Sequence, residues 1–494
     1  MSGEKMVRSN RPNILFAIAD DQSWPHAGAY GCRPVNTPAF DRIAEEGVLF
    51  TNAFTAAPQC SPNRAAILTG RNIWQLEEAG THASNFPKKF TVYTELLQES
   101  GYELGYTGKG WGPGNWQYNG REMNPAGPAF DAKKGTTDKR GYLSISNIDY
   151  AENLRQFLTR RDSAKPFHFW YGSKEPHRRY AQGSGRRAGK RIDDVQVPYF
   201  LPDTEEIRND ILDYMLEIDY FDQHLQKMLQ ILEDYGELEN TIIVVTSDNG
   251  MPFPRAKANL YEYGTHVPLA IRWPQKITGG RTIDDLTAAI DLAPTFLDAA
   301  GIKIPTEMTG RSIWHALSGT KNGRVDAARD VLLAGRERHT HARPDNLGYP
   351  IRAIRDYRFL YIHNIKPDRW PAGNPTGSGE AEGFHDVDAS PTKSLILENK
   401  NKTDIKPFYE LAFAKRSEEE LYDIVKDPYC IHNLALDKAF ADIKAAFKEK
   451  LMTALRQQND PRAFGYEIFE SYPRYSRMRD FAGFKERGKY NLNF

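Results

Sequence analysis

The chain of 494 residues has few cysteines, no net charge and no long apolar segment. Its three cysteines allow one disulfide at most, which excludes a disulfide framework in a chain of this length. The 65 basic residues balance 65 acidic ones, whereas a general nucleic-acid binder needs an excess of Lys and Arg. No apolar run approaches the roughly 20 residues that cross a bilayer. We therefore expect neither nucleic acid nor a membrane as a partner, although a locally basic pocket for an anionic substrate is compatible with this balance.

The sequence does contain the material of a large α/β fold, with 40% apolar and 26% charged residues. The segments Asn13–Ala19 and Thr241–Thr246 are apolar on both faces, which is typical of central strands in a parallel sheet covered by helices. Further strands are predicted at Glu103–Gly108 and Pro166–Ser173, and apolar residues recur at helical spacing in Glu205–Leu232. Strands that alternate with helices indicate βαβ units.

The character of the sequence changes near residue 330, where shorter elements and polar turns begin. We therefore expect two domains, an α/β catalytic domain over 11–328 and a smaller α+β domain over 329–494. The elements predicted in the second domain are strands at Val331–Ala334, Ile351–Ile354 and Phe359–Ile362, a long loop over Lys366–Ser390 and a helix over Phe440–Gln457.

Polar side chains follow four of the predicted strands, and ligands bind at the carboxyl ends of strands in an open α/β sheet. The carboxylate and amide oxygens among them are hard ligands that suit Ca²⁺ or Mg²⁺ rather than Zn²⁺. Acidic pairs are also ordinary turn and cap residues at strand exits, but two such pairs after two buried strands favour a metal site. The residues concerned are Asp20 and Asp21, Lys109, His177, and Asp248 and Asn249.

Cys60 directly precedes a predicted helix, with Ser61 expected at the N-cap and Pro62 at the first helical position. A helix N-terminus favours an anion or a thiolate, and Arg64 can bind the same anion through two N–H groups. Cap chemistry alone favours the simpler interpretation, a capped helix with an incidental cysteine.

The pattern Cys60-x-Pro62-x-Arg64, followed by Leu68-Thr69-Gly70, resembles the signature of the type I, formylglycine-dependent sulfatase family. Other segments similar to motifs of that family occur in order between about residues 11 and 460. They are Arg11–Leu15 before Asp20; Ser247–Gly250, Lys257, Tyr261–Gly264 and Val267–Leu269; and Glu420–Asp423 with Asp427, Pro428, Asn433 and Leu434. The resemblance implies an alkaline-phosphatase-like α/β fold, with a mostly parallel sheet sandwiched by helices and a smaller C-terminal α+β domain.

The resemblance also implies a cofactor and a modified residue. Cys60 would be converted to formylglycine by a formylglycine-generating enzyme, and a hydroxyl of its hydrated aldehyde would attack sulfur. A divalent metal, Ca²⁺ or alternatively Mg²⁺, would polarise the sulfate oxygens. The implied metal ligands are Asp20, Asp21, residue Cys60 after conversion, Asp248 and Asn249.

By the same resemblance, three cations would neutralise charge on the SO₃ group: Arg64, Lys109 and Lys257. His177, with Lys257, would protonate the leaving oxygen or nitrogen, after which the sulfated hydrate would collapse and release sulfate. Without the resemblance, His177 and the two lysines fit solvated surface residues.

One departure from the family pattern concerns the histidine of Lys-x-His, because Lys109-Gly110-Trp111 has tryptophan in its place. Another base, with His82 as a candidate, would have to serve, or turnover at that step is altered. A protein that binds sulfated sugar without cleaving it is therefore an alternative, and so is a phosphonate monoester or phosphodiester hydrolase of the same superfamily.

The expected substrate is a sulfated mono- or oligosaccharide, because several stretches are most similar to the heparan N-sulfatase (sulfamidase) branch. O-sulfated polysaccharide fragments are the alternative substrate. Residues that can recognise the sugar are His82, Trp111, His266, Arg336, Glu337 and His339. A solvated charged loop explains the cluster near 336–339 equally well, and burial is the commoner fate of tryptophan.

Residues 1–10 contain no apolar segment of the kind found in secretory signals. Members of the family usually act outside the cytoplasm, so we expect a periplasmic or secreted protein whose leader is missing from this chain. A dimer is compatible with the sequence.

Overall fold

The computed structural model describes residues 11–135, 145–376 and 383–475. Within these ranges the largest element is a seven-stranded sheet in the order β4-β5-β1-β6-β7-β2-β8. The first four strands of this order run parallel, and β7 runs antiparallel to both β6 and β2. The strands are β1 (Asn13–Ala19), β2 (Val48–Phe50), β4 (Glu103–Gly108), β5 (Phe167–Gly172), β6 (Thr241–Ser247), β7 (Leu269–Arg272) and β8 (Arg281–Ile283).

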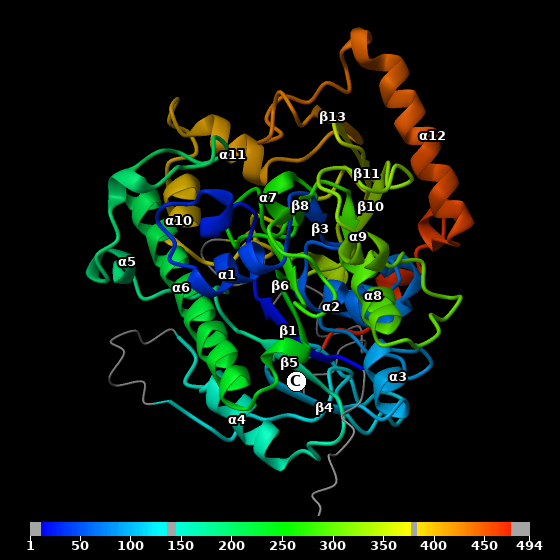
Figure 1. Cartoon of the computed structure of the whole chain (residues 1–494). Coiled ribbons are helices and arrows are strands. Elements are labelled where there is room, and N and C mark those ends of the chain that lie inside the picture. The colour runs from blue at the N-terminus through cyan, green and yellow to red at the C-terminus, as the bar shows by residue number, and fades with distance from the viewer. Residues whose placement is uncertain (1–10, 136–144, 377–382, 476–494) are drawn as a thin grey trace, which may run out of the picture.

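The two faces of the main sheet are each buried under helices (Figure 1). Along β1, alternate side chains enter opposite apolar clusters, with Phe16 in one and Leu15 in the other. The first cluster includes α2 (Cys60–Thr69), α3 (Tyr93–Glu99), α8 (Leu292–Ala299) and α9 (Trp314–Ser318). The second includes α1 (Pro38–Glu46), α4 (Tyr150–Arg160) and the long α6 (Glu205–Asp234). This double burial explains why β1 and β6 are buried at every position and are apolar along most of their length.

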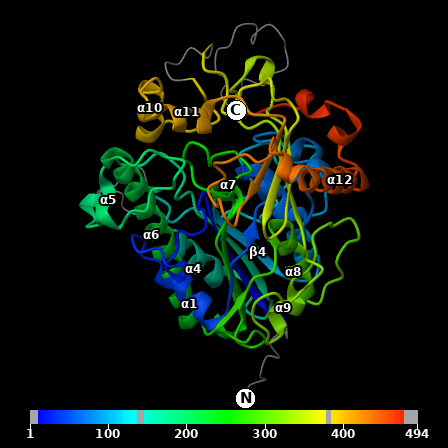
Figure 2. The same cartoon turned by 90° about the horizontal axis from the view of Figure 1, so that it is seen from above.

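A separate antiparallel sheet lies in the C-terminal part, in the order β10-β11-β12-β13. One of its faces packs against α12 (Ala441–Gln457), and α10 (Pro391–Glu398) and α11 (Lys406–Phe413) pack near α6, as Figure 2 shows. The four strands are β10 (Leu332–Arg336), β11 (Ile351–Arg355), β12 (Phe359–Asn364) and β13 (Glu419–Asp423).

The remaining α-helices and strands are short. They are β3 (Ala53–Phe54), which pairs with β9 (Thr287–Ala288), and the helices α5 (Ser184–Arg187) and α7 (Glu262–Thr265). In the described ranges, no helix combines the length and apolarity that spanning a membrane requires.

The strands and helices predicted from the sequence are confirmed to within about two residues at each end. The described residues of the predicted loop 366–390 contain neither helix nor strand. The predicted start of α2 is wrong by two residues: Gln59, not Ser61, takes the N-cap position, and Cys60, not Pro62, is the first helical residue. The Ser61 hydroxyl instead accepts a hydrogen bond from the Ala83 N–H at 3.0 Å, which fixes a neighbouring loop against the helix. The domain boundary at 328–329 stays a prediction.

Phe16 gives a test of this core. Its ring packs edge-on against Trp170, with centroids 4.8 Å apart, and against Phe296 at 5.5 Å. We expect Phe16→Ala to lower the free energy of unfolding by about 3–5 kcal/mol, because it opens a cavity in a fully buried layer. Urea denaturation followed by fluorescence measures the change. The control is Phe464→Ala, since Phe464 is 52% exposed; an equal loss in both variants would contradict this description of the core.

Candidate active site

Three carboxylates meet at the carboxyl ends of β1 and β6. The parallel pairing aligns Ala19 with Ser247, so the residues that follow, Asp20 and Asp248, emerge side by side. Carboxylate oxygens of Asp20, Asp21 and Asp248 and the Sγ of Cys60 all lie within 4.8 Å of one another. All four residues are buried, and the left-handed backbone of Asp21 (φ 76°) turns its side chain back into the group. The predicted meeting of strand ends is therefore confirmed.

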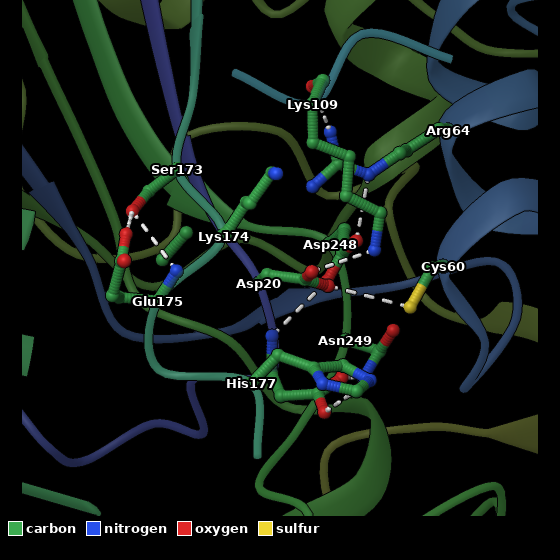
Figure 3. Close-up of polar contacts among 12 residues, drawn as sticks. Asp20, Cys60, Arg64, Lys109, Ser173, Lys174, Glu175, His177, Asp248 and Asn249 are labelled. Atoms are coloured by element: carbon green, nitrogen blue, oxygen red, sulfur yellow. Dashed lines mark hydrogen bonds and ion pairs between the residues drawn. The ribbon is translucent and has the colours of Figure 1, made fainter. Parts of the chain in front are cut away.

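Each carboxylate is paired with its own cation, and Figure 3 shows two of these pairs, Asp20 with Lys109 and Asp248 with Arg64. Arg64 Nε lies 2.7 Å from Asp248 Oδ2, Lys109 Nζ lies 2.6 Å from Asp20 Oδ2, and Lys257 Nζ lies 2.5 Å from Asp21 Oδ2. Burial lowers the pKa of both lysines, but the neighbouring carboxylates outweigh it and raise each pKa above its usual value. Both ammonium groups therefore stay charged.

Cys60 lies at the N-terminal end of α2, with its Sγ 3.3 Å from Asp20 Oδ1. Burial, reinforced by the Asp20 carboxylate, raises the pKa of the Cys60 thiol well above its usual range. The unmodified side chain is therefore a neutral thiol, and a neutral thiol is a poor nucleophile.

The donor set fits a divalent metal ion. Asn249 Oδ1 is buried and, among the described residues, accepts no hydrogen bond, while Asn249 Nδ2 donates to Asp21 Oδ1. An unpaired buried oxygen is uncommon, and here it lies beside three carboxylates. Hard oxygen donors gathered in this way are what Ca²⁺ and Mg²⁺ take as ligands.

A cavity of about 770 Å³ opens onto this group. Its lining includes Asp20, Cys60, Lys109 and His177, which the sequence predicted for one site. The His177 side chain is 34% exposed, and its Nε2 lies 3.8 Å from Asp21 Oδ2. The other lining residues are His82, Tyr106, Gly108, Gly110–Gly114, Trp116, Asn124, Ser146, Asn147, Lys174, Glu175, Arg178 and Glu217.

The residues suggested for sugar recognition divide into two sets. His82 and Trp111 line the cavity, and the indole of Trp111 donates to the carbonyl of Ser61 at 3.0 Å. His339 lies just behind this wall, since its ring centroid is 4.7 Å from that of His82.

Three other candidates are held in internal contacts and are not among the residues that line the cavity. His266 stacks on Trp24 and Phe54, each at 4.4 Å between centroids. Arg336 pairs with Asp386 at 2.8 Å, and Glu337 accepts hydrogen bonds from Arg352 and Arg462. The cluster near 336–339 is thus buried, so the alternative prediction of a solvated charged loop at these residues is wrong.

Asp388, Lys174 and Arg178 belong to the site or its cavity and were not predicted. Asp388 Oδ2 lies 3.7 Å from Lys257 Nζ. Arg178 lines the cavity and forms two hydrogen bonds, of 2.7 and 2.8 Å, with Asp210. Proximity to His177 in the sequence is a signal for Lys174 and Arg178, whereas Asp388 follows no strand and carries no such signal.

The mostly parallel sheet covered by helices, with a buried polar centre at its strand ends, has the alkaline-phosphatase-like fold. The chain belongs to the sulfatase family, since the sulfatase family model matches residues 12–302. Members of this family are sulfuric ester hydrolases with a formylglycine-type modified cysteine and a bound metal, and the group around Cys60 can hold such an ion.

Individual relatives agree with this assignment. The chain is 28% identical to N-sulphoglucosamine sulphohydrolase of Homo sapiens, over 92% of each chain. It is 29% identical to an ulvan-active sulfatase of Formosa agariphila, over 92% of this chain and 81% of the relative. A solved structure of a protein in complex with its substrate D-glucosamine-2-N,6-O-disulfate has the same fold, with a TM-score of 0.65 and 21% identity over 91% of this chain and 99% of the other.

The Arg64–Asp248 pair can be tested through stability. Both side chains are fully buried, so Arg64→Met leaves the Asp248 carboxylate without its cation. We expect the free energy of unfolding to fall by about 3–5 kcal/mol. Arg186→Met is the control, because the Arg186–Glu205 pair is exposed and contributes about 1 kcal/mol at most. Thermal and urea denaturation of both variants check this. Similar losses in the free energy of unfolding would show that the buried pair contributes no more to stability than the exposed one.

Proposed function

We propose that this protein is a sulfatase that hydrolyses the sulfate group of a sulfated saccharide, with Ca²⁺ as its metal and Cys60 converted to formylglycine. The observation that supports the proposal best is the polar group at the cavity, where Cys60 lies among three carboxylates that are each paired with a cation; Cys60, Asp20 and Lys109 line the cavity itself. A tetrahedral anion that enters the cavity meets Lys109 on its wall, and Arg64 and Lys257 are buried in the same polar group, where charge stabilisation is stronger than in water.

Four residues are proposed to hold the metal: Asp20, Asp21, Asp248 and Asn249. Their oxygens suit Ca²⁺, and Mg²⁺ is the alternative. When bound, the metal polarises the sulfate oxygens and adds positive charge at the site.

Arg64, Lys109 and Lys257 are proposed to bind the sulfate oxygens and to neutralise the charge that develops on them. The Nη2 of Arg64 is buried and has no hydrogen-bond partner in the described part of the chain, so the guanidinium has a free donor for such an oxygen. Lys109 approaches from the end of β4, and Lys257 from the loop after β6.

His177 is proposed as the acid that protonates the leaving group. Its Nδ1 lies 2.7 Å from the carbonyl oxygen of Arg178. A carbonyl only accepts, so Nδ1 carries a proton and the neutral ring has its free lone pair on Nε2. Nε2 faces the acidic group, and after taking up a proton it can donate it to a leaving oxygen or nitrogen at the cavity.

The substrate class follows from the cavity and the relatives. A volume of about 770 Å³ is in the range of pockets for small organic ligands and is larger than a sulfate ion needs. Tyr106 and Trp116 on its wall offer aromatic surface for a sugar ring. We propose N-sulfated glucosamine as the first candidate, in view of the human relative, and O-sulfated saccharides as the second.

Maturation by a formylglycine-generating enzyme is part of the proposal, because burial and Asp20 keep the unmodified thiol neutral. We also propose a periplasmic or secreted location.

A panel of saccharides tests the function. We expect sulfate release from N-sulfoglucosamine or from a 2-O-, 3-O- or 6-O-sulfated sugar, and a loss of about 10⁴-fold or more in Cys60→Ala, which lacks the nucleophile. Released sulfate is measured by ion chromatography, and Cys32→Ala is the matched control because Cys32 lies outside the cavity lining.

Two outcomes would replace the proposal. Faster cleavage of a phosphate diester or phosphonate monoester by the same preparation would indicate the related hydrolase. Conversion of residue 60 makes the chain about 18 Da lighter. A chain coexpressed with the maturing enzyme that keeps its thiol by intact-mass analysis, and releases no sulfate, would indicate a binding protein.

A further inference from the structure

Asp388 reaches the centre from the C-terminal part of the chain, between β12 and α10. Its Oδ2 lies 3.7 Å from the Nζ of Lys257, and one of its oxygens lies within 4.8 Å of both an oxygen of Asp21 and a ring nitrogen of His177. Lys257 Nζ is 2.5 Å from Asp21 Oδ2. The ammonium of Lys257 is therefore placed between two carboxylates, one close and one at a slightly longer distance.

One oxygen of the Asp388 carboxylate is an unused hydrogen-bond acceptor within the described residues. Its Oδ2 is buried and accepts no hydrogen bond from the residues that the structure describes, although 31% of the side chain is exposed. Burial raises the pKa of Asp388, but Lys257 and His177 outweigh it and bring that pKa to about 2. Asp388 is therefore an anion, and a buried anionic oxygen without a donor is costly unless a cation approaches it.

The balance of charges at the site shows when a cation has to move closer to Asp388. Asp20, Asp21 and Asp248 are balanced by Lys109, Lys257 and Arg64 in the present arrangement. A divalent ion on the three carboxylates adds two positive charges and uses the Asp21 oxygens as ligands. The ammonium of Lys257 is then repelled by the ion and needs another counterion within reach.

We propose that Asp388 is a positioning residue that serves as the second counterion of Lys257 and takes over its ammonium when a divalent ion occupies Asp21. The shift required is small, since Lys257 Nζ is already 3.7 Å from Asp388 Oδ2. Asp388 thereby lowers the competition between lysine and metal for Asp21 and keeps Lys257 beside the sulfate position. This inference rests on the proposed function only through the divalent ion.

Calcium binding to the full-length protein tests the inference without any turnover. Isothermal titration of the chelator-treated chain with Ca²⁺ compares the unaltered protein with Asp388→Asn, Lys257→Met and the double variant. We expect Asp388→Asn to raise the Kd for Ca²⁺ about tenfold, because Lys257 then stays on Asp21. In the Lys257→Met background, where no lysine competes, the same substitution should change the Kd about threefold at most. The matched control is Asp404→Asn, since Asp404 is an exposed aspartate of the same region.

Other outcomes would overturn the inference. An unchanged Kd in Asp388→Asn means that Asp388 is no counterion for Lys257. An equal loss in both backgrounds means that Asp388 acts on the ion directly, and a second bound Ca²⁺ that disappears in Asp388→Asn would make it a ligand. If the unaltered chain binds neither Ca²⁺ nor Mg²⁺ in the same titration, the proposed metal centre fails and the inference fails with it. Circular dichroism and thermal melting of each variant establish that it is folded.

Discussion

Compensation of buried charge is the constraint on which this structure depends. Three carboxylates are buried where β1 and β6 end, and an isolated buried ion costs several kcal/mol. Burial alone would raise the pKa of Asp20, but Lys109 and His177 outweigh it and lower that pKa. Each cation is brought by a different element: Arg64 by α2, Lys109 by the end of β4, and Lys257 by the loop after β6. The sheet, the helix and that loop must therefore all be in place before any of these charges is tolerated, and the fold and the site form together.

A second ion network extends this constraint to the C-terminal sheet. Asp386 accepts from Arg336 and lies 2.7 Å from Arg343, and the backbone N–H of Thr340 donates to it at 2.9 Å. Asp386 is two residues before Asp388, so these contacts fix the backbone that carries Asp388 to Lys257. Arg336, which the sequence suggested for binding sugar, thus contributes to the site by holding the backbone near Asp388, and it does not line the cavity.

The sequence predicts the centre of this molecule better than its periphery. The end of β1 is correct because an apolar strand that stops at a polar residue is a strong local signal. The strand β7 was not predicted, because four residues carry little periodicity and antiparallel pairing at that position depends on its neighbours. His266 is polar and close to a motif in the sequence, yet aromatic stacking places it elsewhere. Asp388 could not be found, since its position depends on a contact 131 residues from Lys257 in the chain and on no local pattern.

Trp111 stands where the family motif has a histidine, and the tertiary structure brings a different histidine to the same cavity. The Trp111 indole is 2% exposed, donates to Ser61 and packs against Phe86 at 5.0 Å, so it closes one side of the cavity beside Cys60. His82 lines the same cavity, and the Ala83 N–H bonded to Ser61 holds that loop in place. Burial and the neighbouring His339 lower the pKa of His82 well below its usual value, and within the described residues its Nδ1 has no hydrogen-bond partner. Among the described residues, a neutral imidazole with an unpaired ring nitrogen therefore lines the same cavity as Cys60, although it comes from a different segment of the chain than the motif predicts.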